Sequence, residues 1–281
     1  MSVGTTFAFW KMAGGGNDFI VLDGVTTSLP PIEPERVRRW CRRGLSIGAD
    51  GVIAVTPSGS AQVRMLHWNS DGGANPYCGN GTRCVARFAV ESALAGPTLR
   101  IETGAGIMQA EVEAQSGRVS VQVPRPRDLR RGVRVSAHGR SFAGGFVLVG
   151  VPHFVTEVDD LASLDVASVG AALRSHAEFG EAGANIDFIR RAGEGIVEIR
   201  TYERGVEAET LSCGSGAIAA AVWLGVDCEE RGSVLMRTRS GVELGVRNGG
   251  TAREPVLWLA GDARIIYTGT ATGEAAEGFP A

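Results

Sequence analysis

Short runs of apolar and β-branched residues, separated by glycine-rich turns, recur along the chain and predict strands. In the first half these runs cover residues 19–23, 52–55, 63–68, 99–102, 107–112 and 119–123. In the second half they cover residues 146–149, 154–158, 186–191, 196–202, 234–238, 242–246 and 256–259. Helical patterns are fewer and cover residues 34–43, 82–94, 166–176 and 217–224. Many strands with few helices predict an α+β fold.

The predicted elements fall into two similar halves. The motif Cys-Gly-Asn-Gly begins at Cys78, and Cys-Gly-Ser-Gly begins at Cys213, 135 positions later. The same shift places residues 48–50 over residues 183–185, and we expect this register to hold without a gap over residues 18–90. We therefore interpret the chain as two homologous lobes, each a curved, mostly antiparallel sheet wrapped around one central helix. A glycine- and alanine-rich tail after residue 268 is expected to fray.

The composition is that of a globular protein of two ordinary domains. The chain has 281 residues, of which 44% are hydrophobic and 21% are charged. A net charge of −3 predicts no general affinity for nucleic acid or for anionic membranes. Five arginines gather in residues 124–134, a proline-rich segment without aromatic residues, which we interpret as a solvated linker or edge.

The location of the protein is predicted from three further features. Lys11 interrupts the only apolar stretch near the N-terminus, so no signal peptide is expected. No uninterrupted apolar segment reaches membrane-spanning length. Five cysteines, without the spacing of a small disulfide scaffold, indicate reduced thiols. A cytoplasmic enzyme is the expectation, and the sequence leaves homodimerisation open.

The two cysteine motifs indicate a chemistry that needs no cofactor. Each cysteine lies at the start of a helix-forming run, where free N–H groups bind carboxylate and the helix dipole favours negative charge. The same field is expected to lower the thiol pKa below its usual value of roughly 8.5. A substrate α-carboxylate held by both helix ends would place its Cα between the two sulfur atoms. One thiolate would then remove a proton while the other thiol delivers one to the opposite face, as in a racemase or epimerase.

The alternative is that both cysteines are buried structural residues on tight turns, because free cysteine is commonly buried. Their duplication on equivalent turns favours the catalytic interpretation. Cys41, Cys84 and Cys228 lack such surroundings and are interpreted as structural. The spacing between Cys78 and Cys84 is not a usual zinc spacing, and no second Cys/His cluster accompanies it, so no metal site is expected.

Two residues of the second half are candidates for supporting the thiols. His153 and Glu203 lie in polar, turn-adjacent segments, and either side chain would be able to accept or relay a thiol proton. The alternatives are an ordinary turn histidine after Pro152 and an ion pair between Glu203 and Arg204.

The three glycines at residues 14–16 are a candidate ligand loop. They match neither the dinucleotide-binding spacing nor the phosphate-loop spacing, and a strand pattern follows instead of a helix. A substrate-contacting turn that presents Asn17 is therefore the favoured interpretation.

These residues lie within longer motifs that resemble the diaminopimelate epimerase family. The matching segments are residues 11–19, 69–72, 78–84, 150–153, 183–185, 202–205 and 209–216. The resemblance implies two pseudo-symmetric lobes with the active site between them, and a strand near residues 263–267 that returns to the first lobe. The first lobe would then comprise residues 1–122 plus 260–281, and the second residues 123–259.

The resemblance also implies roles for individual residues. Cys78 and Cys213 would be the base and the acid, exchanging roles with reaction direction. His153 and Glu203 would support the thiols and the substrate amino group. The reacting α-carboxylate would be held by Gly79, Asn80, Gly214 and Ser215. The rest of the substrate would be bound by Asn17, Asn69, Asn185, Glu203 and Arg204, with the asparagines and the arginine chiefly at the distal amino-acid end.

Two positions depart from the family pattern. Val151 stands where many members carry Asn, and Gly51 stands where many carry Gln, and both side chains would contact the distal end. The leading hypothesis is interconversion of LL- and meso-diaminopimelate, in lysine and peptidoglycan precursor biosynthesis, without pyridoxal phosphate or metal. The alternatives are a racemase for another small-molecule amino acid, such as histidine or a proline derivative, and a thiol redox or binding protein.

Overall fold

The computed structural model describes residues 6–228 and 232–277, and the chain divides into two compact units. Unit 2 is the continuous segment Gln122–Gly261. Unit 1 comprises the chain before Gln122 together with the segment from Asp262 onward. The lobe boundaries expected from the resemblance fall after residues 122 and 259, whereas the structure divides the chain after Val121 and after Gly261.

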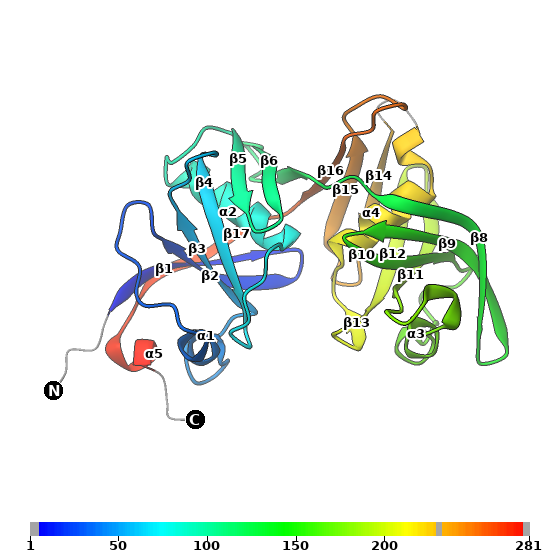
Figure 1. Cartoon of the computed structure of the whole chain (residues 1–281), viewed down its shortest axis with the longest axis horizontal. Helices are drawn as coiled ribbons and strands as arrows, with labels where there is room; N and C mark the ends of the chain where they lie inside the picture. Colours follow the sequence, from blue (N-terminus) through cyan, green and yellow to red (C-terminus); the bar gives the residue numbers. More distant parts are fainter. Residues whose placement is uncertain (1–5, 229–231, 278–281) are drawn as a thin grey trace. The chain divides into compact units, whose positions relative to one another are not determined.

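Unit 1 is one sheet with a helix on each face (Figure 1). Its strands are β1 (Phe7–Gly14), β2 (Asn17–Asp23), β3 (Gly51–Thr56), β4 (Val63–Asn69), β5 (Thr98–Thr103), β6 (Gly106–Val112), β7 (Val119–Gln122) and β17 (Arg264–Ala271). Its helices are α1 (Pro34–Cys41), α2 (Gly79–Glu91) and α5 (Gly273–Glu277). The strands pair in the order β17–β1–β2–β3–β4–β5–β6–β7, in which β2–β3 and β4–β5 are parallel and the other pairs antiparallel.

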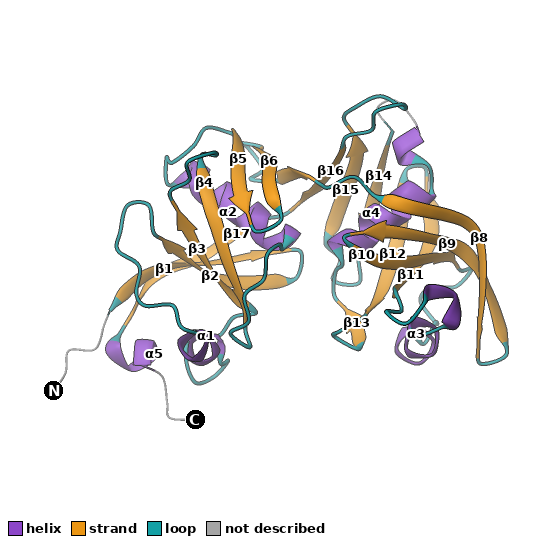
Figure 2. Cartoon of the chain, in the orientation of Figure 1, coloured by secondary structure: helices purple, strands orange, loops and turns teal. Residues whose placement is uncertain are grey.

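Unit 2 repeats this arrangement (Figure 2). Its strands are β8 (Arg127–Ala137), β9 (Arg140–Val149), β10 (Val151–Glu157), β11 (Asn185–Gly193), β12 (Ile196–Glu203), β13 (Ala208–Thr210), β14 (Ser233–Arg237), β15 (Glu243–Asn248) and β16 (Leu257–Gly261). Its helices are α3 (Val166–Arg174) and α4 (Gly214–Trp223), with 3₁₀ turns η1 (Ala177–Phe179) and η2 (Val226–Cys228). The pairing order β8–β9–β10–β11–β12–β14–β15–β16 is parallel at β10–β11 and β12–β14, as in unit 1.

Each sheet wraps around a central helix that is buried on nearly all sides. In α4 every residue from Gly216 to Val222 is buried, and in α2 the buried run extends from Asn80 to Ala86. Helix α2 packs against β1 to β6, and α4 packs against β9, β10, β11, β14 and β15. Helices α1 and α3 cover the opposite faces with narrower apolar stripes, such as the one containing Trp40. The predicted α+β fold with two similar lobes is confirmed.

Strand pairing corrects the ungapped register in one region. The residues that face the central helix are Ile53 and Val55 in β3, and Asp187 and Ile189 in β11. They are offset by 134 positions, not by the 135 that relate the two cysteines. An offset of 135 would place Ile53 over Phe188, which packs on the opposite face beside α3. A one-residue slip turns every side chain of a strand to the other face, so the sequence alignment was wrong for β2 to β4.

The corrected register defines which residues of the two units are equivalent in these strands. Both the parallel pairs and the antiparallel pairs agree with it. The equivalent pairs are Phe19 with His153, Gly51 with Asn185, Ile53 with Asp187, His67 with Thr201, and Asn69 with Glu203.

Several predicted elements begin or end elsewhere in the structure. The predicted helices at 82–94 and 217–224 begin three residues earlier, directly after each cysteine. Of the tail expected to fray, residues 269–271 continue β17 and residues 273–277 form α5, so this part is regular structure, and residues 278–281 lie outside the described residues. Most of the arginine-rich segment 124–134 lies in β8, an edge strand that pairs with β9, so of the two expected alternatives, linker or edge, the structure shows the edge.

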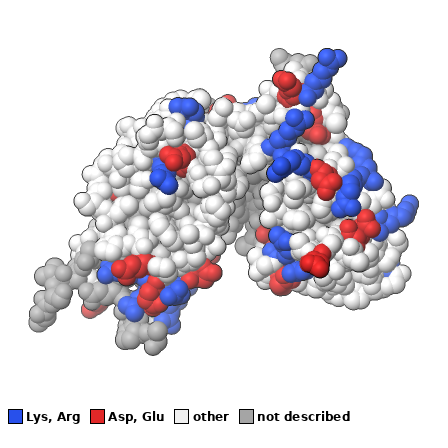
Figure 3. All heavy atoms as spheres, viewed as in Figure 1, with Lys and Arg blue, Asp and Glu red and all other residues white. Residues whose placement is uncertain are grey.

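Charges of both signs mix on the surface. On the face drawn in Figure 3, arginines and carboxylates lie next to one another on both units. Arg130 of β8 pairs with Glu178, and Arg190 pairs with Glu198. The arginines of unit 2 are therefore partly neutralised by neighbouring acids.

Candidate active site

Cys78 is the N-cap residue of α2. Its backbone is extended, and its Sγ accepts a hydrogen bond from the N–H of Gly81 at 3.4 Å. Its carbonyl oxygen accepts the N–H of Thr82 at 2.8 Å, which begins the helix. Gly81 suits this turn because a Cβ there would lie 2.9 Å from Met65 Cε. The first-turn N–H groups have no intrahelical acceptor and are oriented for an anion.

Cys213 caps α4 in the same way. Its Sγ accepts the N–H of Gly216 at 3.4 Å, and Ser215 Oγ lies 3.4 Å from the same sulfur. The side chain is buried, whereas that of Cys78 is half-buried. The two thiols therefore occupy equivalent places, each at the N-terminus of the central helix of its unit.

The direction of the thiol pKa shifts differs from the sequence-based expectation. Burial is the largest cause and raises the pKa of both thiols above their usual range. At Cys78 the N–H of Gly81 and the Arg83 cation partly oppose the effect of burial. At Cys213 the carboxylates of Glu203 and Asp187 add to it, so its pKa is raised further. The helix N-terminus does lower both values, but burial outweighs it, and the expected low pKa was wrong.

A chain of hydrogen bonds fixes the start of α2 in unit 1. Asn80 Nδ2 donates to Asn17 Oδ1 at 2.8 Å, and Asn80 Oδ1 accepts from Arg83 Nη2 at 2.7 Å. The guanidinium of Arg83 is fully buried, and its Nε donates to the carbonyl of Asp262 at 3.3 Å. The Asp262 carboxylate accepts the N–H of Gly15 at 2.8 Å. The glycine turn, α2 and the returning C-terminal segment are thereby held together.

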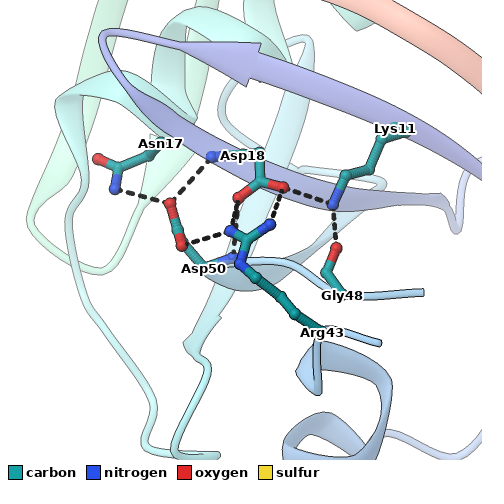
Figure 4. A network of polar contacts seen from close by, with 6 residues as sticks. All are labelled: Lys11, Asn17, Asp18, Arg43, Gly48 and Asp50. Carbon is teal, nitrogen blue, oxygen red and sulfur yellow. Dashed lines mark hydrogen bonds and ion pairs between the residues drawn. The ribbon is translucent and has the colours of Figure 1, made fainter. Parts of the chain in front are cut away.

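A charged network orients Asn17 from the other side (Figure 4). Asn17 Nδ2 donates to Asp50 Oδ2 at 3.0 Å, and Arg43 binds both Asp50 and Asp18. Lys11 pairs with Asp18 at 2.7 Å and also donates to the carbonyl of Gly48. Burial raises the pKa of Asp18, but the hydrogen bonds and charges of Arg43 and Lys11 outweigh it and lower the pKa to about 2. The Asn17 amide is therefore held in one orientation.

In unit 2 a fully buried His–Asp pair lies beside Cys213. His153 Nδ1 and Asp187 Oδ2 are 2.7 Å apart, and Thr201 donates to the other carboxylate oxygen at 2.8 Å. A Cβ on Gly216 would lie 2.3 Å from Asp187 Oδ1, so this carboxylate packs against the first turn of α4. His153 lies in β10 and is not an ordinary turn histidine.

The other predicted residues of unit 2 gather near this pair. Asn185 is buried, its Oδ1 accepts the N–H of Arg204 at 2.8 Å, and its Nδ2 lies 3.4 Å from His153 Nε2. The Arg204 guanidinium is bonded to the carbonyl of Ala182 at 3.1 Å. Glu203 accepts from Thr210 at 2.6 Å, so its bonded partner is a hydroxyl and not Arg204.

In unit 1, Asn69 ends β4 with its side chain exposed. Its Oδ1 accepts from Asn75 Nδ2 at 3.0 Å, and its backbone N–H donates to the carbonyl of Gly73. These bonds hold the loop that leads from β4 to Cys78. Asn17, Asn69 and Asn80 are thus on elements that meet around the start of α2.

The structure adds site residues that the sequence analysis missed. Asp50, Arg83, Asp187 and Asp262 bind directly to predicted site residues or lie against a helix start. A signal was present for two of them. Asp187 stands between the apolar residues Ile186 and Phe188 of a strand, and Arg83 lies in the buried first part of α2, and buried charges need partners. Asp50 and Asp262 meet their partners only through tertiary contacts.

The remaining cysteines differ from one another. Cys41 and Cys84 are buried, and burial raises the pKa of each to about 12, in keeping with a structural role. Cys228 is exposed, so it does not serve as a core residue.

Within residues 6–228 and 232–277, no three His, Cys, Asp or Glu side chains gather as metal ligands would. Across the same residues no helix has the length and apolar character needed to cross a membrane.

The two departures from the family pattern lie at strand starts. Val151 begins β10 and pairs with Val149. Gly51 begins β3 and pairs with Asn69. A Cβ on Gly51 would lie 2.6 Å from the carbonyl oxygen of Trp68 and 2.8 Å from His67 Nε2, so the backbone and an imidazole occupy the space that a side chain would need.

Comparisons with known sequences agree with this site. The family model described as diaminopimelate epimerase matches residues 9–127 and 145–266. A diaminopimelate epimerase of Aquifex aeolicus (strain VF5) is 36% identical over 279 residues, covering 96% of this chain and 99% of the relative. One of Archaeoglobus fulgidus (strain ATCC 49558 / DSM 4304 / JCM 9628 / NBRC 100126 / VC-16) is 41% identical over 226 residues, covering 76% and 80%.

Solved structures are similar in fold. A phenazine biosynthesis protein of the PhzF family from Bacillus anthracis has a TM-score of 0.70 at 17% identity and covers 95% of this chain and 99% of its own. A hydroxyproline epimerase from Agrobacterium vitis, with bound trans-4-hydroxy-L-proline, has a TM-score of 0.67 at 16% identity and covers 97% and 98%. At these identities the likeness shows the fold alone.

Proposed function

Since the chain belongs to the diaminopimelate epimerase family, an isomerase family, we propose that it interconverts LL- and meso-diaminopimelate by proton transfer at Cα. One observation carries the proposal. Cys78 and Cys213 are both N-caps of a central helix, and each sulfur accepts the N–H three residues further on at the same 3.4 Å. Two equivalent thiols beside two anion-binding helix ends fit a reaction that needs a base and an acid on opposite faces of one carbon.

The proposed steps balance in protons. One cysteine, as thiolate, takes the Cα proton and becomes a thiol. The resulting carbanion takes a proton on its other face from the second cysteine, which becomes the thiolate. The negative charge that develops on the α-carboxylate is stabilised by first-turn N–H groups, including those of Gly79, Asn80, Gly214 and Ser215. The reverse reaction restores the starting protonation states.

Other polar residues are proposed to support the thiols and bind the distal end of the substrate. His153 and Glu203 would support Cys213 and the substrate amino group, because Asp187 holds the imidazole beside the start of α4. Asn17, Asn69, Asn185 and Arg204 would bind the distal amino-acid end, where the planar guanidinium matches a carboxylate. The proposed partner is therefore a small amino acid with charges at both ends.

Catalysis without pyridoxal phosphate is part of the proposal. That cofactor is held as a Schiff base with a lysine amine. The chain contains one lysine, Lys11, and it is buried, paired with Asp18 and bonded to the carbonyl of Gly48. A lysine held in this way is poorly placed for a Schiff base.

We also propose a reducing, cytoplasmic setting, since Cys78 and Cys213 must stay unoxidised to act.

Deuterium incorporation tests the proposal directly. The protein is incubated in heavy water with LL-diaminopimelate, and mass spectrometry follows both Cα–H exchange and formation of the meso isomer. Wild-type protein should do both, whereas Cys78→Ala and Cys213→Ala should each lose epimerisation by several orders of magnitude, because each removes one proton donor or acceptor. Cys228→Ala, at an exposed cysteine, is the control and should retain wild-type turnover.

Two outcomes would contradict the proposal. Near-full turnover by Cys78→Ala would exclude the two-thiol mechanism. Exchange with histidine or a proline derivative, and none with diaminopimelate, would assign the protein to another amino-acid substrate. The departures at Gly51 and Val151 are the reason to include these amino acids in the panel.

A further inference from the structure

His67 is a buried polar side chain without a bonded partner. Its side chain lies in β4 and is 5% exposed, and within the described residues neither ring nitrogen has a hydrogen-bond partner. Its ring meets Phe19 edge-on, with 5.6 Å between the ring centroids. An unpaired buried donor or acceptor costs free energy, so such a group needs a functional explanation.

The face of β4 on which His67 lies is the face that carries the site. Side chains alternate along a strand, so Val63, Met65, His67 and Asn69 share one face. Val63 and Met65 pack in the core around α2, and Met65 reaches Gly81 in the first turn of that helix. His67 is therefore placed between the start of the Cys78 helix and Asn69, a proposed substrate ligand.

The position of unit 2 that is equivalent to His67 carries a polar side chain with a hydrogen-bond partner. His67 corresponds to Thr201, which bonds the carboxylate of Asp187 beside Cys213. The neighbouring equivalents are Asn185 for Gly51 and Glu203 for Asn69. In unit 2 these three positions carry polar side chains, and each has a hydrogen-bond partner: Asn185 with His153 and the N–H of Arg204, Thr201 with Asp187, and Glu203 with Thr210. In unit 1 the corresponding positions include Gly51, which has no side chain, and His67, which has no hydrogen-bond partner among the described residues.

The imidazole occupies the space beside Gly51. A Cβ at position 51 would lie 2.8 Å from His67 Nε2 and 3.4 Å from His67 Cδ2. The ring therefore fills the region that a side chain at position 51 would enter. Since Gly51 has no side chain, the polar atom nearest to that space on this face of the sheet is His67 Nε2.

We infer that His67 is a specificity-determining residue of this enzyme, and that its ring N–H donates a hydrogen bond to the distal carboxylate of the substrate. The inference rests on the proposed function. Burial lowers the pKa of His67 to about 4, so the ring is neutral at neutral pH and carries one N–H. A neutral N–H donates to the carboxylate without the cost of burying an imidazolium cation.

Two substitutions at His67 test the inference. His67→Leu removes both nitrogens and keeps an apolar side chain, and His67→Gln restores a donor. With LL-diaminopimelate, His67→Leu should raise KM about tenfold, the size expected for one lost hydrogen bond to a charged group, while kcat changes less than about threefold. His67→Gln should return KM to within about threefold of wild type. The thermal midpoint of His67→Leu should not fall, because an unpaired polar group leaves the interior.

L-Lysine supplies the matched substrate control, since it has a distal amino group but no distal carboxylate. Cα–H exchange of lysine should be equally slow in wild type and His67→Leu. An unchanged KM for diaminopimelate in a folded His67→Leu protein would overturn the inference, as would an equal loss with lysine. These results leave the proposed function intact, which fails only if wild-type protein does not epimerise diaminopimelate.

A measurement on unmodified His67 covers the case in which His67→Leu does not fold. The inactive Cys78→Ala protein, with ¹⁵N-labelled histidine, is titrated with diaminopimelate and followed by NMR. The ring signal assigned to His67, by its absence from His67→Gln, should shift on saturation because its N–H gains an acceptor. A His67 signal that stays in place at saturation would show that the ring does not contact the substrate.

Discussion

The reactivity of Cys78 and Cys213 depends on the balance between burial and the N–H groups of the helix that each residue caps. Burial raises the pKa of both thiols, and at Cys213 the acidic side chains of Glu203 and Asp187 raise it further. A thiol with a raised pKa forms thiolate, the reactive form, only at higher pH. Alkylation of free enzyme should therefore increase with pH beyond the range of an ordinary thiol, and Cys78 should reach half of its maximal rate at lower pH than Cys213.

Peptide mass spectrometry after timed iodoacetamide treatment measures each site separately. The exposed Cys228 is the internal control and should follow an ordinary thiol profile. The position of each profile along the pH axis reports the pKa, whereas its height reports access to the sulfur. If Cys213 reached half of its maximal rate at lower pH than Cys78, the electrostatic difference between the two sites would be wrong.

At the residue scale, the sequence predicted the groups that lie on the chemical motifs and missed those that support them. Cys78 and Cys213 stand out because a short motif is repeated. Asp50 and Asp262 give no such signal, because their partners, Asn17 and the N–H of Gly15, are identified only once the strands pair and the C-terminal segment returns. His67 gives no signal in the sequence. Its proposed role depends on the space beside Gly51, which is identified only when β3 and β4 pair.

At the element scale, two equivalent glycines in the central helices should respond differently to the same substitution. In Gly216→Ala the new methyl group would lie 2.3 Å from Asp187 Oδ1, and the carboxylate is held by His153 and cannot retreat without breaking that bond. In Gly81→Ala the methyl group would meet Met65 Cε at 2.9 Å and Ile53 Cδ1 at 3.0 Å, which are the mobile ends of side chains.

We expect Gly216→Ala to lower the free energy of unfolding by about 2 kcal/mol, as overpacking does, and to reduce turnover more than tenfold. Gly81→Ala should change the free energy by less than about 1 kcal/mol, since the gain in helix propensity offsets the crowding. Urea unfolding and epimerisation assays on the two variants make the comparison. Equal losses in both variants would show that the packing of Asp187 against α4 is not what distinguishes them.

The predictability of elements follows the strength of their patterns. Strands rich in Val and Ile, such as β3 and β12, are predicted because their composition alone identifies them. β1 was missed because Lys11 stands among its apolar residues, and its ion pair with Asp18 is a tertiary contact. Arginines and Gly132 interrupt the alternation of β8, so its pattern indicates a linker or an edge and does not identify a strand. The helix starts were placed late because Gly-Asn-Gly and Gly-Ser-Gly have poor helix propensity and are helical only because a cysteine caps them.

At the scale of the whole chain, the duplication is circularly shifted. Unit 2 takes its first strand, β8, directly before β9, whereas unit 1 takes the equivalent strand, β17, from the end of the chain to pair with β1. Unit 1 is therefore assembled from two distant segments and unit 2 from one. This arrangement bears on the site through Asp262, which comes directly before β17. Its carboxylate accepts the N–H of Gly15, and its carbonyl oxygen accepts from Arg83 in α2, the helix that Cys78 caps.

A chain that ends at Gly261 should accordingly lose the structure of unit 1 and keep that of unit 2. It lacks β17, so β1 loses its outer partner, and it lacks the two Asp262 bonds that fix the start of α2. Amide hydrogen exchange should show protection retained in β9 to β12 and lost in β1 to β4, with epimerisation abolished. The control is a chain that ends at Ala271, which keeps β17 and removes residues 272–281, including α5, and it should remain active. Native protection of β1 to β4 in the shorter chain would mean that unit 1 is complete without β17, and that the circular shift has no part in supporting Cys78.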